Sequence, residues 1–331
     1  MDCLIPYSLA HFDLLKKPGP NNSGGGVSTK YARCATIPGD INFRRITTTA
    51  EIESDIAWAD WLWFSPIFLG YEQASTYQER VQKFLECDAK FKCISGTELN
   101  IASWPENARR KIIEGVDCIT HVNAYHQKIY NACGIYNSRL LCDPVNEFLF
   151  YPTLKKKRLV CMGQAGWHKR SLLVAKLFKA LKDTDIETCY LGGGSMWGND
   201  KNDNYNQCES EIKAVADVFI ENATEIQVAY HLNESMFYAH VAWHDVSPIS
   251  QRECMMSGLV TFALTHPSMD RLTDYRYETI EELIEGVKTY PQESFENDSK
   301  NARQFALDHN SYHAWREQMQ WILADLNERR L

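Results

Sequence analysis

The chain has 331 residues and a formal net charge of −8 at pH 7. Its length favours two domains, because single hydrophobic cores stop growing at roughly 250–300 residues. The acidic balance excludes a globally basic nucleic-acid-binding protein, so any contact with nucleic acid would depend on local basic patches. The eleven cysteines include no CxxC pair, which argues against a disulfide framework and a zinc site and favours a reducing compartment.

The sequence predicts neither a membrane-spanning helix nor a signal peptide. No apolar run reaches the roughly 18 residues that a spanning helix needs. The N-terminal stretch MDCLIPYSLAHFDLLKK has no basic segment before its apolar residues. We therefore expect a cytoplasmic protein.

The first half of the chain mixes short apolar runs with long polar connections, and residues 18–26 form a glycine-rich loop. In chain order, the patterns predict a helix-like segment at 27–35, a strand at 60–69, a helix at 77–91, a strand at 92–95, a helix and strand over 107–123, and a helix from 124 that ends at Gly134. Two prolines and a loss of periodicity at 143–158 place a domain boundary there, after residue 152.

The second half alternates strands and helices more regularly. The expected elements are strands at 158–163, 186–194, 225–230, 241–247 and 259–264, and helices at 171–183, 209–222, 233–241, 252–257, 279–290 and 311–328. Such alternation predicts βαβ units and a parallel sheet. Ligands of these sheets bind outside the carboxyl ends of the strands, so each strand-exit loop is a candidate site.

Two of these loops are rich in glycine. Residues 163–170 place glycines, His168, Lys169 and Arg170 before a helix, which suits a phosphate group, although a solvated basic turn is the simpler alternative. The loop lacks the P-loop pattern. Residues 192–198 fail the dinucleotide-binding pattern at Trp197, which argues against an NAD-dependent oxidoreductase.

A third strand-exit loop, at 243–258, carries two acids. Ser247 can cap the following helix, and Pro248 suits its first position. Asp245 precedes Glu253 by eight residues, so both carboxylates are expected at the mouth of the site, where they suit sugar hydroxyls.

Three segments, in matching order and spacing over roughly residues 115–275, resemble the retaining nucleotide-sugar glycosyltransferases of the GT-B fold. Asp245, Glu253 and the following Ser257-Gly258 resemble that family's E-x7-E region. Residues 159–194 resemble its G-R-x4-K-G segment, and residues 116–152 resemble its interdomain stretch. The resemblance implies an α/β protein of two Rossmann-like domains whose parallel sheets face across a cleft. Residues 1–152 would bind the acceptor, 153–310 would bind the donor, and the helix at 311–331 would cross back to the first domain.

The resemblance also implies site roles. Glu253 would bind the nucleotide ribose, Asp245 would contact the donor sugar, and Lys169 would neutralise the departing diphosphate. Further donor-binding candidates are Gly163, Gln164, His168, Arg170, Gly193, Gly194, Tyr230, Ile249 and Ser250. Acceptor-binding candidates are Gly24, Gly25, Gly26, Lys17 and Glu98. The donor would be a nucleotide sugar, with a UDP-sugar first, and no metal would be required. Transfer would proceed with retention through an oxocarbenium-like transition state.

Two positions depart from the family pattern. Its first acid is usually Glu, whereas this chain has the shorter Asp245. Its diphosphate arginine falls on Gln164, and Arg170 or His168 are the candidates to replace it. Loss of that charge keeps a second class of function open, a nucleotide-sugar-binding module without transfer activity or a nucleotide-sugar epimerase.

The acceptor is the least specified part. A branch of GT-B enzymes in bacteriophages glycosylates hydroxymethylated bases flipped out of double-stranded DNA, which suits the compact length of this chain. Local basic runs could bind such DNA: Lys16-Lys17, Arg44-Arg45, Arg109-Arg110-Lys111 and Lys155-Lys156-Lys157-Arg158. Trp61, Trp63 and Trp104 could stack on bases, although a core position is favoured for the first two. DNA is favoured by a small margin over a glycan or lipid-linked acceptor.

Overall fold

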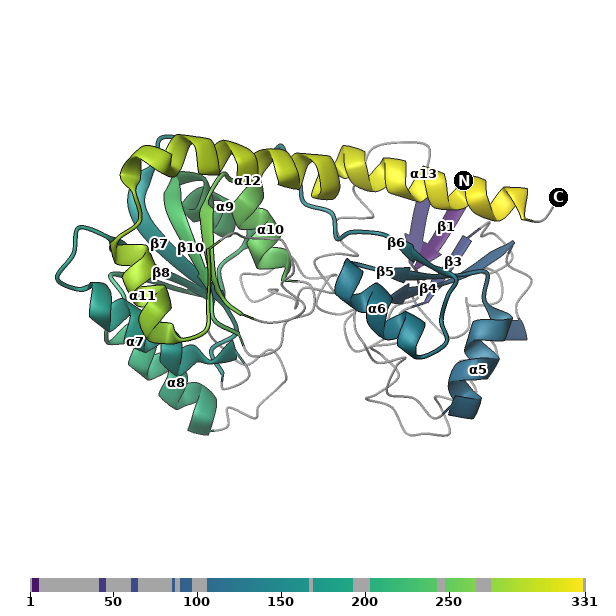
Figure 1. Ribbon diagram of the computed structural model, residues 1–331, viewed down its shortest axis with the longest axis horizontal. Helices are drawn as coiled ribbons and strands as arrows, with labels where there is room; N and C mark the ends of the chain where they lie inside the picture. The colour runs from purple at the N-terminus through teal and green to yellow at the C-terminus, as the bar shows by residue number, and fades with distance from the viewer. Residues whose placement is uncertain are drawn as a thin grey trace. The chain divides into compact units, whose positions relative to one another are not determined.

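The computed structural model describes residues 2–5, 42–45, 61–64, 85–86, 90–96, 106–166, 169–192, 203–242, 248–265 and 275–329. The chain forms two compact units, each built on a parallel sheet (Figure 1). The first unit holds the strands before Pro144 together with the C-terminal residues from His313, and the second runs from Val145 to Tyr312. The acceptor and donor roles predicted for the two domains stay predictions.

The sheet of the first unit has the strand order β2-β1-β3-β4-β5-β6, with every pair parallel. Its strands are β1 (Asp2–Ile5), β2 (Asn42–Arg45), β3 (Trp61–Phe64), β4 (Phe91–Gly96), β5 (Cys118–His121) and β6 (Ser138–Leu140). Helices α5 (Glu106–Gly115) and α6 (Ala124–Ala132) follow β4 and β5. The strand predicted at 92–95 is confirmed, and so is the helix that begins at residue 124.

The C-terminal helix α13 (Tyr312–Glu328) bonds to the last strand of the first sheet. Asp325 forms an ion pair with Arg139 of β6 at 2.8 Å, and the Gln318 side chain accepts a hydrogen bond from the Cys142 amide. These contacts attach the end of the chain to the unit in which it began. None of the helices in the described ranges combines the length and the apolar character that crossing a membrane requires.

The sheet of the second unit has the order β12-β11-β10-β7-β8-β9, again with every pair parallel. Its strands are β7 (Lys156–Gly163), β8 (Glu187–Gly192), β9 (Val218–Glu221), β10 (Ser235–His240), β11 (Val260–Leu264) and β12 (Tyr275–Tyr277). Counted within the unit and read from β9, this order is 3-2-1-4-5-6, that of the Rossmann fold. The order reverses between β7 and β10, so the carboxyl ends of these two strands are where a ligand is expected.

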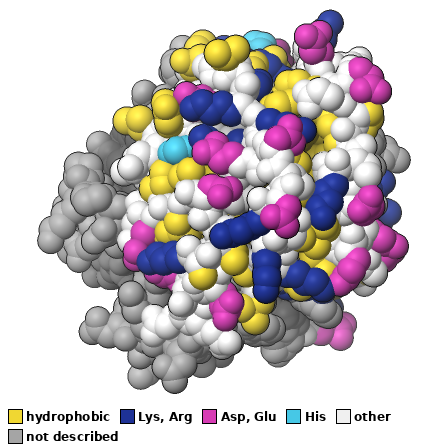
Figure 2. All heavy atoms as spheres, turned by 90° about the vertical axis from the view of Figure 1, so that its left-hand side faces the viewer, with side chains coloured by type: hydrophobic (Ala, Val, Ile, Leu, Met, Phe, Trp, Pro, Cys, Tyr) yellow, Lys and Arg dark blue, Asp and Glu magenta, His cyan; other side chains and the backbone are white. Residues whose placement is uncertain are grey.

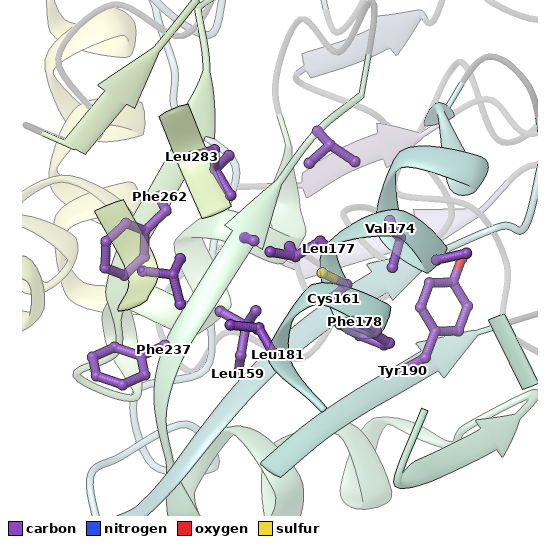
Figure 3. Packing of buried hydrophobic residues seen from close by; sticks show 14 of the residues in the cluster. Leu159, Cys161, Val174, Leu177, Phe178, Leu181, Tyr190, Phe237, Phe262 and Leu283 are labelled. Atoms are coloured by element: carbon purple, nitrogen blue, oxygen red, sulfur yellow. The ribbon is translucent and has the colours of Figure 1, made fainter. Parts of the chain in front are cut away.

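Helices join the strands of the second unit and cover its sheet. They are α7 (Ser171–Leu181), α8 (Asp203–Lys213), α9 (Glu225–Glu234), α10 (Ile249–Met256), α11 (Ile280–Lys288) and α12 (Phe295–Asn310), with a short 3-10 turn at Gln292–Ser294. Leu177, Phe178 and Leu181 of α7 pack on Leu159 and Cys161 of β7 (Figure 3). Their apolar spacing along α7 follows the helical period, which explains why the helix predicted at 171–183 is found.

Between residues 209 and 241 the predicted elements are wrong, because strands and helices are exchanged along this segment. The expected helix at 209–222 ends at Lys213, and its last residues form strand β9. The expected strand at 225–230 is helix α9, and the expected helix at 233–241 is strand β10. Thr224 and Gln227 form a capping box that begins α9. Strand β10 is buried along its whole length, and such a run cannot be told from a buried helix by periodicity.

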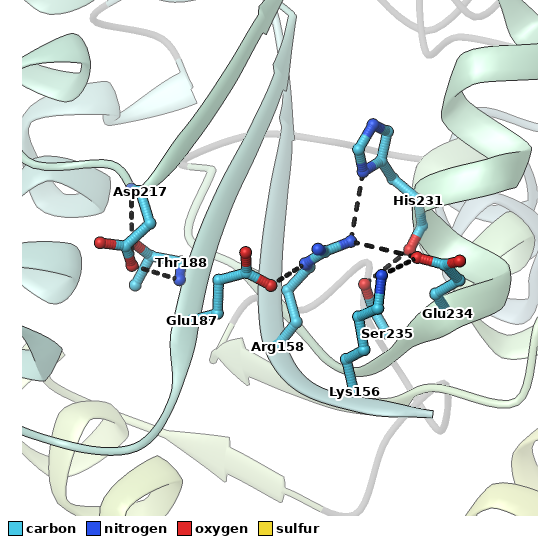
Figure 4. A network of polar contacts seen from close by, with 8 residues as sticks. All are labelled: Lys156, Arg158, Glu187, Thr188, Asp217, His231, Glu234 and Ser235. Carbon is cyan, nitrogen blue, oxygen red and sulfur yellow. Dashed lines mark hydrogen bonds and ion pairs between the residues drawn. The ribbon is translucent and has the colours of Figure 1, made fainter. Parts of the chain in front are cut away.

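Charged side chains gather at the amino ends of β7, β8 and β10 (Figure 4). Arg158 is 5% exposed and donates from Nε to Glu187 at 2.6 Å, while its Nη1 lies 3.2 Å from His231. Lys156 donates to Glu234 at 2.6 Å. We call Lys156, Arg158, Glu187, His231 and Glu234 the amino-edge network. Each cation in it has a carboxylate, which offsets the cost of desolvating Arg158.

Candidate functional site

The backbones at the carboxyl ends of β7 and β8 pack closely because each strand ends in a glycine. Gly163 and Gly192 are register partners, and both have positive φ, at 132° and 148°. A Cβ atom on Gly192 would lie 1.9 Å from the Gly163 carbonyl oxygen. Only glycine fits at residue 192, so the backbone of the two strand ends is left without side chains.

The loop after β7 is held from within. The Tyr190 hydroxyl donates to the Gly163 carbonyl at 3.0 Å, and burial raises the pKa of this phenol above its usual range. Ser171 Oγ accepts from the Gly166 amide at 2.8 Å and donates to its carbonyl at 3.1 Å. These two hydrogen bonds join Gly166 to the first residue of α7.

Arg170 stands at the N-cap of α7 in the left-handed region, with φ of 51°. This conformation costs a non-glycine residue about 1–2 kcal/mol. The resembled family has glycine at this position. The chain therefore has an arginine where backbone geometry favours glycine, beside Lys169 and before the N-terminal end of α7.

Gln164 follows Gly163 and is half-buried. Within the described part of the chain, its buried Nε2 makes no hydrogen bond. A buried N–H without an acceptor costs about 1–3 kcal/mol. An acceptor oxygen on a ligand would remove that cost, although the Gln164 amide carries no charge.

Strand β10 meets the first turn of α10 through a chain of three side chains. The Tyr238 hydroxyl lies 2.9 Å from His240 Nδ1 and 2.9 Å from Ser250 Oγ. Tyr238 is fully buried and His240 is 6% exposed. Because β10 pairs with β7, this chain lies at the strand-order reversal, where Gly163 also ends its strand.

Helix α10 begins after Pro248, which is its N-cap rather than the first helical residue predicted from the sequence. The ψ of Pro248 is 99°, an extended conformation that cannot continue the helix. Helical geometry gives the amides of Ile249 and Ser250 no acceptor within the helix, so they suit an anion. Glu253 lies one turn further and is 6% exposed.

The C-terminal end of α10 is fastened as well. Gly258, with φ of 74°, ends it in a Schellman motif in which the Leu259 amide donates to the Cys254 carbonyl at 2.9 Å. Lys155 Nζ donates to the Ser257 carbonyl at 2.6 Å, and Arg303 donates to the Met256 carbonyl. The Arg303 cation at the helix C-terminus stabilises its dipole, and the Lys155 side chain adds a hydrogen bond. The helix that carries Glu253 and Ser250 is thus positioned at both ends.

The structure brings some predicted residues together and separates another. Gly163 ends β7 and Gln164 follows it, while Ser250 of α10 contacts Tyr238 of the neighbouring strand β10. Tyr230 is 56% exposed on α9, where its hydroxyl bonds to Glu234 of the amino-edge network. The structure therefore does not place Tyr230 with the other candidates.

Several predicted residues lie outside the described ranges. They are Asp245, His168, Gly193, Gly194, Gly24, Gly25, Gly26, Lys17, Glu98 and Trp104. The side chains of Arg44, Arg45, Trp61 and Trp63 are likewise not described. Within the residues that are described, no group of three or more His, Cys, Asp and Glu side chains could hold a metal ion.

The basic run at 155–158 is engaged inside the second unit. Lys155 bonds to Ser257, Lys156 to Glu234, and Arg158 to Glu187. Lys157 pairs with Asp185 at 2.7 Å. On the face drawn in Figure 2, Lys and Arg side chains are interspersed with Asp and Glu side chains rather than gathered into one patch. Each basic side chain of this run therefore has a hydrogen-bond acceptor within the second unit.

Sequence reasoning missed Tyr190, Tyr238, His240 and Gln251. Gln251 is fully buried in the first turn of α10, and its Nε2 lies 3.4 Å from Thr261 Oγ1. The available signal for Tyr238 and His240 was the pattern Tyr-x-His within an otherwise apolar segment. That segment was predicted as a helix at 233–241, whereas it forms strand β10.

Solved structures share this architecture over nearly the whole chain. HepE (Alr3699) of Anabaena, in complex with UDP-glucose, superposes with a TM-score of 0.66 at 10% identity, covering 98% of this chain and 100% of HepE. A sucrose-phosphate synthase from Thermosynechococcus elongatus gives a TM-score of 0.70 at 13% identity, with 99% and 100% covered. A glycosyltransferase from Rickettsia africae gives 0.64 at 9% identity, with 98% of each chain covered.

The sequence matches no protein-family model and no curated protein. At identities of 9–13%, the likeness to solved structures establishes the fold. The architecture that they share is the GT-B fold. The α/β architecture of GT-B type predicted from the sequence is therefore confirmed.

Proposed function

We propose that this protein is a glycosyltransferase that moves a sugar from a nucleoside diphosphate, UDP first, to a hydroxyl acceptor. The observation that carries the proposal is found where the strand order reverses: Gly163 ends β7, and Ser250 in the first turn of α10 contacts Tyr238 of the neighbouring β10. Gly163 and Gly192 leave backbone exposed to a ligand, and the amides of Ile249 and Ser250 suit phosphate. HepE, which shares the fold, holds UDP-glucose in its crystal structure.

The proposed roles follow the chemistry of each group. Glu253 accepts hydrogen bonds from the two ribose hydroxyls, and Asp245 contacts the donor sugar. Lys169, Arg170 and the N-terminal end of α10 stabilise the charge that develops on the diphosphate as it leaves. Stabilising the charge on the leaving diphosphate is the main catalytic task of the site. Gln164 contributes a hydrogen bond to it but no charge, so Lys169 and Arg170 must supply the charge.

The reaction proposed is transfer with retention. The bond between the anomeric carbon and the diphosphate oxygen breaks, and the electron pair leaves with the diphosphate. The acceptor hydroxyl oxygen bonds to the anomeric carbon on the same face. Its proton passes to the departing phosphate, so no protein base is required and the products are a glycoside and a nucleoside diphosphate.

Two classes of acceptor are carried forward, a hydroxymethylated base in DNA and a hydroxyl of a glycan or lipid-linked acceptor. The run at 155–158, which favoured DNA from the sequence, is occupied by contacts within the protein. Arg110 pairs with Glu114 at 3.9 Å on an exposed helix face. These contacts weaken the reason for preferring DNA, so neither class of acceptor is preferred.

The test begins with a thermal-shift screen of UDP-, GDP-, ADP- and CMP-sugars, because a ligand that binds only the folded state raises its Tm. Release of the nucleotide from the best donor is then followed alone, with DNA containing hydroxymethylcytosine, and with a glycan panel. Glu253→Ala is compared with Glu285→Ala, an exposed acid on α11.

Each result has a defined meaning. A donor-specific shift that Glu253→Ala abolishes and Glu285→Ala retains would support the proposed donor site. Faster release with one acceptor would identify its class. Binding without release under any condition would leave a nucleotide-sugar-binding module, and no shift with any donor would defeat the proposal.

A further inference from the structure

The chain of Ser250, Tyr238 and His240 carries an inference that rests on the proposed function. Its central member, Tyr238, is fully buried in β10, with both neighbours at 2.9 Å from its hydroxyl. A buried hydroxyl placed between two polar partners fixes the position of each. Ser250 is thereby held on the first turn of α10, at the end of the helix that suits an anion.

The number of protons in this chain limits what Ser250 can do. The Tyr238 hydroxyl has one proton and can donate to only one of its two partners. If Tyr238 donates to His240 Nδ1, Ser250 must donate to Tyr238 and can then only accept from a ligand. If His240 Nδ1–H donates to Tyr238, Tyr238 donates to Ser250, and the Ser250 proton is free for a ligand. The direction of the chain thus decides whether Ser250 is a donor or an acceptor.

A bound diphosphate selects one direction. Its ionised oxygens accept hydrogen bonds, and the N-terminal end of α10 offers them further donors. Gln164, where the resembled family has a charged arginine, makes an additional donor valuable at this place. We propose that His240 and Tyr238 orient Ser250 so that its hydroxyl donates a hydrogen bond to the diphosphate of the nucleotide sugar.

In this arrangement Ser250 is a diphosphate-binding residue, and Tyr238 and His240 are positioning residues that act through it. The arrangement requires the His240 proton on Nδ1, the nitrogen that faces Tyr238. It requires no charge on His240, Tyr238 or Ser250. An oriented hydrogen bond from Ser250 would replace part of the diphosphate binding that the family's arginine, here Gln164, provides through its charge.

The experiment measures dissociation constants by calorimetry for uridine, UDP and UDP-glucose. The variants are Ser250→Ala, Tyr238→Phe, their double variant, and Tyr290→Phe. Tyr290 is the matched control, because its hydroxyl bonds to Asp298 at 2.8 Å and not to α10. Ser250→Thr serves as the conservative variant that keeps the hydroxyl.

We expect Ser250→Ala to weaken UDP and UDP-glucose binding by roughly tenfold or more and to leave uridine unchanged, since a hydrogen bond to a charged group is lost. Tyr238→Phe should show the same pattern with a smaller loss. The double variant should bind UDP as weakly as Ser250→Ala alone, because Tyr238 acts through Ser250. Ser250→Thr and Tyr290→Phe should keep the affinity for UDP.

Three other results would overturn the inference. Equal weakening of uridine and UDP would assign Tyr238 and Ser250 to the packing of β10 and α10 alone. A loss confined to UDP-glucose would mean that Ser250 contacts the sugar rather than the diphosphate. Unchanged affinities in both variants would remove Ser250 from the site. If the wild-type protein bound none of the three compounds, the proposed donor would fail with it.

Discussion

The amino ends and the carboxyl ends of the strands in the second sheet differ in how their polar groups are paired. At its amino ends, Arg158, Lys156, Glu187 and Glu234 pair with one another within hydrogen-bonding distance. At its carboxyl ends, glycines replace side chains, and the Gln164 amide makes no hydrogen bond within the described residues. One edge is complete without a ligand, whereas the other offers donors. Charge density alone would favour the amino edge, which is opposite to the proposed donor site.

The largest expected effect comes from adding a methyl group at Gly192, at the carboxyl end of β8. Gly192→Ala would bring a Cβ to 1.9 Å from the Gly163 carbonyl oxygen, at a φ of 148°. We expect the free energy of unfolding to fall by about 3 kcal/mol or more, from strain and overlap together. Urea unfolding measures this loss.

The control is Gly163→Ala, whose Cβ would meet nothing within 4 Å although φ is 132°. It should cost only the conformational strain, about 1–3 kcal/mol. Equal losses in the two variants would show that the close approach of the strand ends has no energetic consequence.

The amino edge is tested with Arg158→Met. Removing this buried cation leaves Glu187 and Glu234 without it, and we expect unfolding to become easier by about 1–3 kcal/mol. The dissociation constant for UDP should not change, because the network lies at the other ends of the strands. Lys157→Met, which breaks a pair with the exposed Asp185, should stay within about 0.5 kcal/mol of wild type. Weaker UDP binding in folded Arg158→Met would mean that the two edges are coupled.

Gln164→Arg should sharpen the contrast by adding charge to the carboxyl edge. We expect UDP to bind roughly threefold to tenfold more tightly and uridine to bind as before, because a guanidinium suits phosphate oxygens. Gln207→Arg adds the same charge on an exposed position of α8. A tighter complex with Gln207→Arg as well would attribute the gain to net charge, and no gain at residue 164 would place it away from the diphosphate.

The smallest effect at neutral pH concerns Lys155, which holds the C-terminal end of α10. Burial lowers the pKa of its ammonium from 10.5 to about 7. Between these values the unfolded chain binds the proton and the folded chain does not, so stability rises with pH through this window. In Lys155→Met the rise should be reduced by at most about 1.4 kcal/mol per pH unit. Unfolding at pH 7, 8 and 9 tests this, and parallel curves for variant and wild type would contradict it.

Sequence patterns predicted the fold where local and long-range signals agreed. The strand at 158–163, the amphipathic helix at 171–183 and the buried strand at 259–264 are all found. Between 209 and 241 the patterns failed, because the Thr224 capping box was not used and the fully buried β10 has no period of its own. Order and spacing of motifs still identified the architecture, since one shifted segment does not change the alternation of strands and helices.

The candidate site was predictable only in part. Gly163, Lys169 and Glu253 stand in motifs that can be read along the chain. Tyr238 and Ser250 are twelve residues apart and meet only because β10 and α10 fold back on each other. The conformation of Arg170 and the overlap at Gly192 depend on backbone geometry that no single-sequence pattern contains.

The fastening of α10 at both ends also affects how its amide hydrogens exchange with solvent. A helix of eight residues is too short to persist in isolation, so it exists only while the second unit is intact. Its amides beyond the first turn should therefore exchange through opening of the whole unit rather than by fraying. Protection of residues 253–256 would report the global stability of the second unit. Any slowing of exchange at Ile249 and Ser250 when UDP is added would report the ligand itself.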